Sequence, residues 1–179
     1  LNQVVPHQMH DNELYKACTL VKSDLLGSKD AVHAYVGTLG GQNSAIAIES
    51  IAPDGYNGVI KLIVGLDNSG TVTGVRVLSH KETPGLGDKK KTKKSKWVLS
   101  FNNKSLQNLS TKEWNVKKDG GIYDQFTGAT ITPRAVVKSV HKALTFFAAN
   151  KEQLLEQANK SNLDGTAAAL EPTANVEEK

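Results

Sequence analysis

Four short runs of mostly apolar residues follow one another from Ala31 to Leu78, and they constrain the fold more than any other feature of the chain. The runs are AVHAYVGTL, SAIAIESI, GVIKLIVGL and TVTGVRVLS, and Gly, Asn, Asp and Pro separate them. β-Branched residues favour extended backbone, and the turn-forming residues between the runs mark strand ends. The DNSG at 67–70 suits a tight hairpin turn between the last two runs. We therefore predict four strands of a mostly antiparallel sheet.

Two segments on either side of these strands have helical spacing. Residues 11–27 place apolar side chains three and four positions apart, and so do the residues after Thr132. Thr132 has the character of an N-cap with Pro133 as the first helical residue, and the helix can extend through Leu154 and Leu155. The two predicted apolar faces are Leu14, Ala17, Cys18, Val21 and Leu25, and Val136, Val140, Ala143, Leu144 and Phe147.

Strands that are flanked by helices, rather than alternating with them, are typical of the α+β class. The chain has 179 residues, of which 39% are hydrophobic and 22% are charged, and this composition suits one globular domain. We expect a single α+β domain over residues 11–158, with a mostly antiparallel sheet flanked by helices. From residue 159 the chain loses its periodicity and ends acidic, so residues 159–179 are predicted to form a flexible tail.

The first residues of the chain carry no recognisable targeting pattern. The chain begins at Leu1, and no window approaches the roughly 18 apolar residues of a membrane span. We expect residues 1–10 to be a frayed remnant after a missing N-terminal membrane anchor. The HQMH in this stretch therefore predicts no metal site. The single cysteine, Cys18, cannot form an internal disulfide, and we expect it to be a buried, unreactive thiol in the first helix.

The net charge of +4 is unevenly distributed: the segment DKKKTKKSK, which contains the basic run Lys89–Lys96, holds six lysines and one acid, and the rest of the chain is roughly neutral. Recognition of nucleic acid favours arginine and interleaved aromatic residues. The run has no arginine, and Trp97 is the one aromatic residue next to it. We therefore predict no nucleic-acid binding, and the run is left as a solvated segment or a contact to lipid or to a partner. Trp97 and Trp114 are expected to be packing anchors, and His33 and His141 to be structural or exposed.

The segment HKETPGLG, residues 80–87, follows directly after the last predicted strand. Its glycines allow backbone conformations that other residues resist, and they let a ligand approach the main chain. The same residues also suit an ordinary turn into a helix, with Thr83 as N-cap and Pro84 at the first helical position. The sequence leaves both interpretations open.

The segment DQFTGATITPRAV, residues 124–136, leads into the second predicted helix. A helix N-terminus presents unpaired N–H groups that suit a phosphate. Gly128 and Ala129 leave room there, and Thr127, Thr130 and Thr132 supply hydroxyl groups. Simple helix capping explains the same residues equally well. A P-loop and a dinucleotide-binding G-x-G-x-x-G are both absent.

Together, these two segments resemble a known family of proteins. Asp124-x-x-Thr127-Gly128-Ala129-Thr130 matches the D-x-x-[ST]-G-A-[ST] signature of domains that carry covalently bound FMN, and ETPGLG at 82–87 matches a second signature of the same domains. With DGG at 119–121, the chain resembles the G subunit of the bacterial Rnf electron-transport complex, over roughly residues 10–155. The C subunit of the sodium-translocating NADH:quinone oxidoreductase is a relative of that family.

The resemblance implies a covalent flavin. In this family, the last Thr of the motif, here Thr130, is esterified to the phosphate of FMN by a separate flavin transferase. The resemblance also implies a flavin environment that includes the rest of the motif and the upstream glycine-containing segment. The cofactor-binding residues expected on this basis are Glu82, Thr83, Leu86, Gly87, Thr127, Gly128, Ala129, Thr132 and Lys138.

The function that the resemblance implies is electron transfer, and the chain is not expected to be catalytic alone. Family members act with other subunits of a membrane-bound, ion-translocating oxidoreductase complex. They hold the flavin domain on the periplasmic face of the bacterial inner membrane by one N-terminal helix. The alternative function is a non-redox module that binds a phosphorylated ligand or a membrane surface, in which the threonines only cap the helix.

Overall fold

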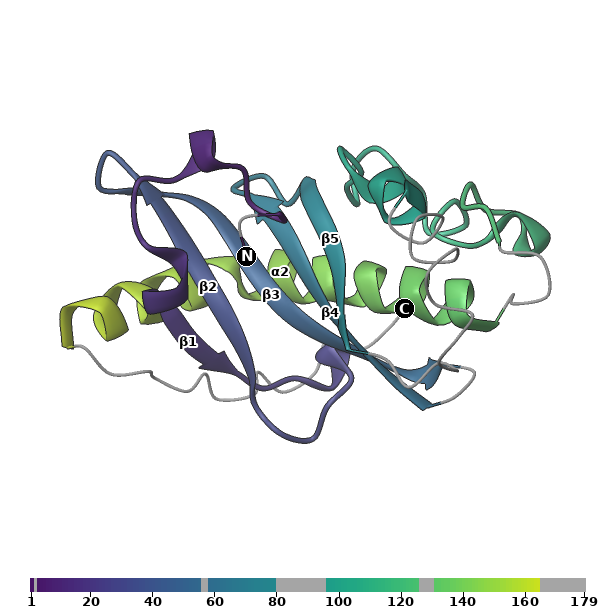
Figure 1. Ribbon diagram of the computed structural model, residues 1–179, viewed down its shortest axis with the longest axis horizontal. Coiled ribbons are helices and arrows are strands. Elements are labelled where there is room, and N and C mark those ends of the chain that lie inside the picture. The colour runs from purple at the N-terminus through teal and green to yellow at the C-terminus, as the bar shows by residue number, and fades with distance from the viewer. Residues whose placement is uncertain (2, 56–57, 80–95, 126–130, 165–179) are drawn as a thin grey trace.

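The computed structural model describes residues 1, 3–55, 58–79, 96–125 and 131–164. Five antiparallel strands form one sheet in the order β1-β2-β3-β4-β5, so every strand pairs with its neighbours in the sequence (Figure 1). Such an order needs only short connections between antiparallel strands. The strands are β1 (Cys18–Val21), β2 (Val32–Leu39), β3 (Gln42–Gly55), β4 (Gly58–Asp67) and β5 (Val72–Ser79).

The four predicted strands are confirmed as β2 to β5, and so is the turn between the last two. Gly70 adopts a φ of 82°, a left-handed conformation that costs glycine little. Its N–H donates to the backbone oxygen of Asp67 at 3.1 Å. The Asp67 carboxylate accepts the backbone N–H groups of Ser69 at 2.9 Å and Thr71 at 3.1 Å. The turn is therefore fixed by the short polar residues that predicted it.

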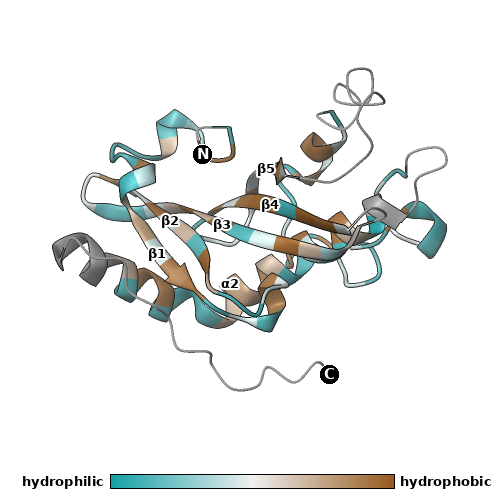
Figure 2. Ribbon diagram, turned by 60° about the horizontal axis from the view of Figure 1, so that its bottom comes forward, coloured by the Kyte–Doolittle hydropathy of each residue, from teal (hydrophilic) through white to brown (hydrophobic). Residues whose placement is uncertain are grey.

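One long helix, α2 (Ile131–Asp164), covers one face of the sheet and packs mainly against β3 (Figure 1). Figure 2 shows apolar residues where α2 and the sheet face one another. The hydroxyl groups of Ser50 and Ser139 form a buried hydrogen bond of 2.7 Å between β3 and α2. The predicted apolar face is confirmed, because Val136, Val140, Ala143, Leu144 and Phe147 are all buried in the core.

The limits of this helix differ from the prediction. α2 begins at Ile131, so Thr132 lies inside the first turn, and its prediction as the N-cap is wrong. Pro133 is tolerated there because the first N–H groups of a helix have no partner within the helix. The helix ends at Asp164, so residues 159–164 belong to it and not to the predicted tail. Residues 165–179 lie outside the described residues.

The helix predicted over residues 11–27 is wrong. The segment forms a short 3-10 helix, η2 (Leu14–Lys16), then strand β1, then η3 (Asp24–Leu26). β1 pairs with β2, from Cys18 opposite Tyr35 to Val21 opposite Val32. Cys18 is half-buried in this strand, and burial, with a contribution from the Glu49 carboxylate, raises the pKa of its thiol. A raised pKa disfavours the thiolate, but the expectation of a buried cysteine within a helix is wrong, because Cys18 is half-buried and lies in a strand.

The N-terminal segment lies on the face of the sheet opposite α2 (Figures 1 and 2). Val4 and Val5 are fully buried there, so the expectation of a frayed terminus is wrong for the described residues of this segment. The hydroxyl of Thr73 donates to the backbone oxygen of Val4 at 2.5 Å. The short 3-10 helix η1 (His7–Met9) follows. A second, smaller core forms here from Val4, Val5, Leu14, Ala45, Ala47 and Ile63.

Residues 96–125 form an irregular unit beside the start of α2 (Figure 1). It contains the 3-10 helices η4 (Val98–Phe101) and η5 (Lys117–Asp119). Two backbone hydrogen bonds of 2.8 Å join it to the first residue of β5, Val72. None of the helices in the described ranges is both long and apolar enough to cross a lipid bilayer.

Candidate functional site

Both sequence motifs fall largely outside the described residues. Glu82, Thr83, Leu86 and Gly87 lie there, as do Thr127, Gly128, Ala129 and Thr130. The structure does describe the residues that flank them, which are the end of β5, the unit of residues 96–125 and the start of α2. Lys138 lies in the second turn of α2, and Thr132 in the first.

A hydrogen bond joins the flanks of the two motif segments. The indole N–H of Trp97 donates to the backbone oxygen of Asp124 at 2.7 Å. Trp97 follows the segment that contains ETPGLG, and Asp124 is the first residue of the flavin-attachment signature. The bond therefore connects the residue that begins the signature to a residue that follows Gly87 by ten positions in the sequence.

Two ion pairs fix the loop that leads into the second motif. The guanidinium of Arg134, in the first turn of α2, donates to both carboxylate oxygens of Asp119 at 2.6 and 2.8 Å. These hydrogen bonds hold the pKa of the Asp119 carboxyl below its ordinary value. The Lys117 ammonium pairs with the Asp124 carboxylate at 2.5 Å. Such paired bonds position the loop against the helix, because a forked guanidinium fixes orientation as well as distance.

The glycine pair at 120–121 allows this loop to close. Gly120 has a φ of 88°. A Cβ at Gly121 would lie 1.9 Å from the backbone oxygen of Asn115, a distance no side chain can occupy. The loop thus passes so close to its own preceding turn that only glycine fits.

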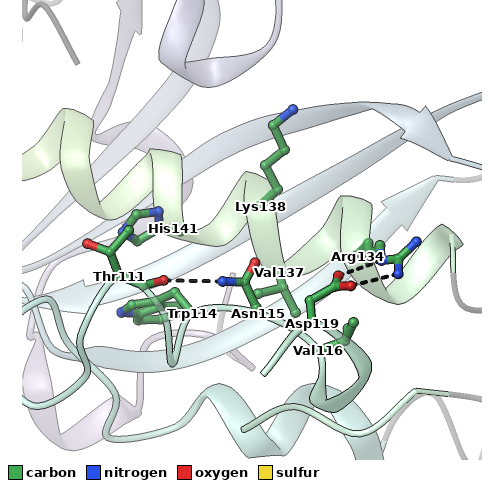
Figure 3. A pocket seen from close by; sticks show the side chains of 9 residues that line it. All are labelled: Thr111, Trp114, Asn115, Val116, Asp119, Arg134, Val137, Lys138 and His141. Atoms are coloured by element: carbon green, nitrogen blue, oxygen red, sulfur yellow. Dashed lines mark hydrogen bonds and ion pairs between the residues drawn. The ribbon is translucent and has the colours of Figure 1, made fainter. Parts of the chain in front are cut away.

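A cavity of about 320 Å³ opens between this loop and the side of α2 (Figure 3). Arg134, Lys138 and His141 lie along the helix wall at intervals of four and three residues, so they share one face of α2. The loop wall is polar around Thr111 and Asn115. The residues that line the cavity are Thr111, Trp114, Asn115, Val116, Asp119, Arg134, Val137, Lys138 and His141.

Trp114 and His141 line this cavity, and a series of aromatic contacts connects Trp114 to Trp97. The ring of Trp114 stacks on His141 at 5.5 Å between centroids and lies 5.6 Å from Tyr123. Phe101 stacks on Tyr123 at 4.6 Å and meets Trp97 edge-on at 5.2 Å. Both tryptophans are packing anchors, as predicted, and Trp114 is 3% exposed. Burial raises the pKa of the Tyr123 phenol far above its ordinary value, so this side chain stays neutral.

The arrangement suits an anionic ligand with a planar group. Lys138 supplies positive charge near the helix N-terminus, which itself favours an anion, while the charge of Arg134 is paired with Asp119. The indole N–H of Trp114 is buried and makes no hydrogen bond with the described residues. Phosphate, ribityl hydroxyls and an aromatic ring are the groups of FMN, and the side chains present fit them. Within the described ranges, no three His, Cys, Asp or Glu side chains lie close enough to share a metal ion.

Sequence reasoning identified Lys138 but missed most of the cavity wall. Asp119 was noted only as part of DGG, and His141 was expected to be structural or exposed. The spacing of Arg134, Lys138 and His141 along one helical face could have revealed a basic stripe. The contribution of Thr111 and Asn115 could not have been found, since their place depends on how the irregular unit folds back on α2.

Comparisons with known proteins identify the family of the chain. A family model described as FMN-binding domain matches residues 55–145, a span that includes both motifs and the cavity. The chain is 61% identical over 155 residues to a protein of Aliivibrio fischeri, covering 86% of the chain and 74% of that protein. It is 58% identical over 159 residues to a protein of Vibrio cholerae, covering 89% and 76%. It is 57% identical over 157 residues to a protein of Vibrio atlanticus, covering 88% and 75%.

All three relatives are named as the G subunit of an ion-translocating oxidoreductase complex. Identity at this level over most of both chains is not limited to the short motifs. The chain therefore belongs to the FMN-binding domain family and, within it, to the G subunits of Rnf-type ion-translocating oxidoreductase complexes.

Proposed function

We propose that this chain is an electron-transfer subunit that carries FMN as a phosphoester on Thr130. The observation that carries the proposal is the hydrogen bond between Trp97 and Asp124, because it joins the first residue of the attachment signature to the stretch of chain that follows the second signature. Membership of the FMN-binding family supports the same cofactor. The alternative of a non-redox binding module gives no reason for both signatures to occur in one chain.

The position of α2 supports Thr130 as the attachment residue. The helix begins at Ile131, the residue directly after Thr130. A phosphate on the Thr130 hydroxyl would be close to the unpaired N–H groups of the first turn, which favour an anion. Lys138 would add positive charge from the second turn of the helix. The remaining threonine of the signature, Thr127, would act by hydrogen bonding and not by forming the ester.

The cavity beside α2 supports a role in holding the flavin. Its polar wall, basic stripe and Trp114 would bind and orient the ribityl phosphate and shield it from water. The Asp119–Arg134 pair would keep the loop at a fixed distance from the attachment residue. Glu82, Thr83, Leu86 and Gly87 would approach the ring from the other segment. The flavin, when bound, supplies the electron transfer, and protein groups around it adjust its potential.

The proposed cellular setting rests on the family resemblance, and the names of the relatives support the chain's membership of a multi-subunit complex. The other subunits of the complex would donate and accept the electrons, and a separate flavin transferase would attach the FMN. We place the domain on the periplasmic face of the bacterial inner membrane, held by an N-terminal helix that precedes this chain. The absence of a P-loop or a G-x-G-x-x-G from the sequence agrees with electrons arriving from partner subunits.

The experiment is coexpression of the chain with a flavin transferase, followed by denaturing electrophoresis and detection of flavin fluorescence in the gel. Wild type should give a fluorescent band at the mass of the chain. Thr130→Ala should give none, because the hydroxyl that forms the ester is gone. Thr127→Ala is the matched control, and we expect reduced but measurable fluorescence.

Two results would contradict the proposal. A fluorescent Thr130→Ala band would place the ester on another residue. A wild-type chain that never acquires flavin in the presence of an active transferase would remove the covalent carrier altogether. Circular dichroism of each variant checks that loss of fluorescence does not reflect loss of the fold.

A further inference from the structure

The end of the molecule that contains the candidate site is strongly basic. Residues 96–142 contain eight Lys and Arg residues and three Asp and Glu residues, whereas the rest of the chain contains fourteen and fifteen. The net charge of residues 96–142 is therefore +5, and their described lysines and arginine lie in the irregular unit and the first half of α2.

The three acidic residues of this end are all engaged within the domain. Asp119 is held by Arg134, and Asp124 by Lys117. Glu113 accepts the backbone N–H of Ser110 at 3.0 Å. Four other lysines of the irregular unit form no salt bridge within the described residues, and they are Lys96, Lys104, Lys112 and Lys118. Lys104 and Lys118 interact at longer range with the Glu113 and Asp119 carboxylates.

Apolar side chains are exposed within the same unit. Leu99 is 47% exposed, and Ile122 is 37% exposed. Leu99 lies between Trp97 and Phe101, and the Ile122 N–H bonds to the backbone of Glu113. Leu99 and Ile122 therefore belong to the framework that flanks the flavin-attachment signature. Exposed apolar residues with a charged rim are typical of protein interfaces.

We propose that Leu99 and Ile122, together with Lys96, Lys104, Lys112 and Lys118 of the same unit, form a docking surface for an acidic face of a redox partner subunit. The proposal rests on the proposed function only in naming the partner as a redox subunit. Partners in electron transfer meet through small surfaces, below about 1,200 Å² in total, and opposite charges steer them together. A basic surface beside the flavin would bring a partner's cofactor within reach of it.

The choice of a protein over a lipid surface follows from the shape of this unit. Helices that lie on membranes present a continuous apolar face with basic residues beside it. Here the exposed apolar side chains are two, and they come from a 3-10 turn and a loop. Two such side chains give little apolar area for insertion into a bilayer, but they suit a small protein contact.

The test uses the full chain and the ion-translocating complex purified without its G subunit. The association rate is measured at low and high ionic strength for wild type, for Lys112→Glu/Lys118→Glu, and for Lys22→Glu/Lys29→Glu. The last variant is the matched control, because it changes the net charge equally through two exposed lysines outside the surface. Leu99→Ser tests the apolar contribution, and vesicles containing phosphatidylglycerol test lipid binding.

We expect Lys112→Glu/Lys118→Glu to slow association by about tenfold or more at low ionic strength and to flatten its salt dependence. The control should stay within about twofold of wild type, because steering depends on charge near the contact. Leu99→Ser should raise the dissociation rate. Equal effects of the two double variants, or binding to the complex that neither changes, would overturn the proposal. If Lys112→Glu/Lys118→Glu lost binding to the vesicles but kept wild-type association with the complex, the surface would bind lipid, and the proposal would be overturned as well.

The result can be separated from the proposed function. Neither Lys112 nor Lys118 lines the cavity, so both variants should carry flavin as wild type does, measured by fluorescence of the denatured chain. Association is measured with flavin-loaded and flavin-free chain. A wild type without covalent flavin would refute the carrier function, while its salt-dependent association would still report on the docking surface.

Discussion

At the scale of single residues, Glu49 is a carboxylate that stays ionised although its side chain is almost completely buried. Its side chain is 6% exposed, on β3. One carboxylate oxygen accepts the backbone N–H of His33 at 2.8 Å and contacts the His33 ring nitrogen at 2.6 Å, and the other pairs with Lys61 at 2.8 Å. Burial alone would raise the pKa of Glu49, but the hydrogen bonds from Lys61 and His33 outweigh it and lower the pKa below its ordinary value. The charge is therefore stabilised by its partners, not by water.

This network predicts a pH-dependent loss of stability in Glu49→Gln. The free energy of unfolding should fall by about 1.5–3 kcal/mol at pH 7, since hydrogen bonds to a charged group are lost. A lowered folded-state pKa stabilises the fold above the unfolded pKa, which is about 4.3 for Glu, and that contribution disappears as pH falls through the folded value. Urea unfolding of both proteins should therefore converge at low pH.

Glu13→Gln is the control, because Glu13 is exposed and pairs only with Lys16 and Tyr15 at the surface. Its unfolding midpoint should match wild type at every pH. A Glu49→Gln protein as stable as wild type at pH 7, or a difference that persists in acid, would contradict this account of the network.

At the scale of elements, the N-terminal segment fits the sheet through two glycines. A Cβ at Gly65 would lie 2.1 Å from the backbone oxygen of Val4, and a Cβ at Gly74 would lie 2.9 Å from the Val4 Cα. Because neither glycine has a side chain, β4 and β5 leave a space on this face of the sheet, and the backbone of the N-terminal segment fills it. Because the obstructing atoms are backbone, a side chain there cannot be accommodated by a change of rotamer.

Gly65→Ala should detach this segment from the sheet. We expect a loss of about 1–3 kcal/mol in stability from overpacking, or displacement of residues 3–10 that avoids it. Hydrogen exchange should show faster exchange at Val4 and Val5. Gly37→Ala is the milder control, since its Cβ would meet side-chain atoms of His10 and Leu14 at 3.2 and 3.4 Å. Unchanged protection of residues 3–10 in Gly65→Ala would rule out this mode of attachment.

Elements with strong local signals could be predicted from the sequence. The apolar runs of β2 to β5, the Asp67–Gly70 turn and the apolar face of α2 each depend on neighbours within a few residues. β1 could not be predicted in this way, because helical spacing over residues 11–27 is also satisfied by two 3-10 turns around a four-residue strand. The burial of Val4 depends on Gly65 and Gly74, which lie far along the chain.

At the scale of the whole molecule, chain segments distant in sequence meet at one end. The irregular unit, the start of α2 and the flanks of both motif segments are joined there by the Trp97–Asp124 bond and the Asp119–Arg134 pair. The motifs themselves were visible in the sequence, because they depend on identity at short spacing. The cavity, the basic end and the aromatic contacts were not, because they arise only when residues 96–125 fold back on α2.

The central claim is that FMN is esterified to Thr130, and peptide mapping tests it most directly. Trypsin cleavage after Lys118 and Arg134 releases residues 119–134, which contain the whole attachment signature. After coexpression with a flavin transferase, mass spectrometry should find this peptide heavier by FMN minus one water, and fragmentation should place the added mass on Thr130. An unmodified peptide, or the added mass on Thr127 or Thr132, would contradict the account.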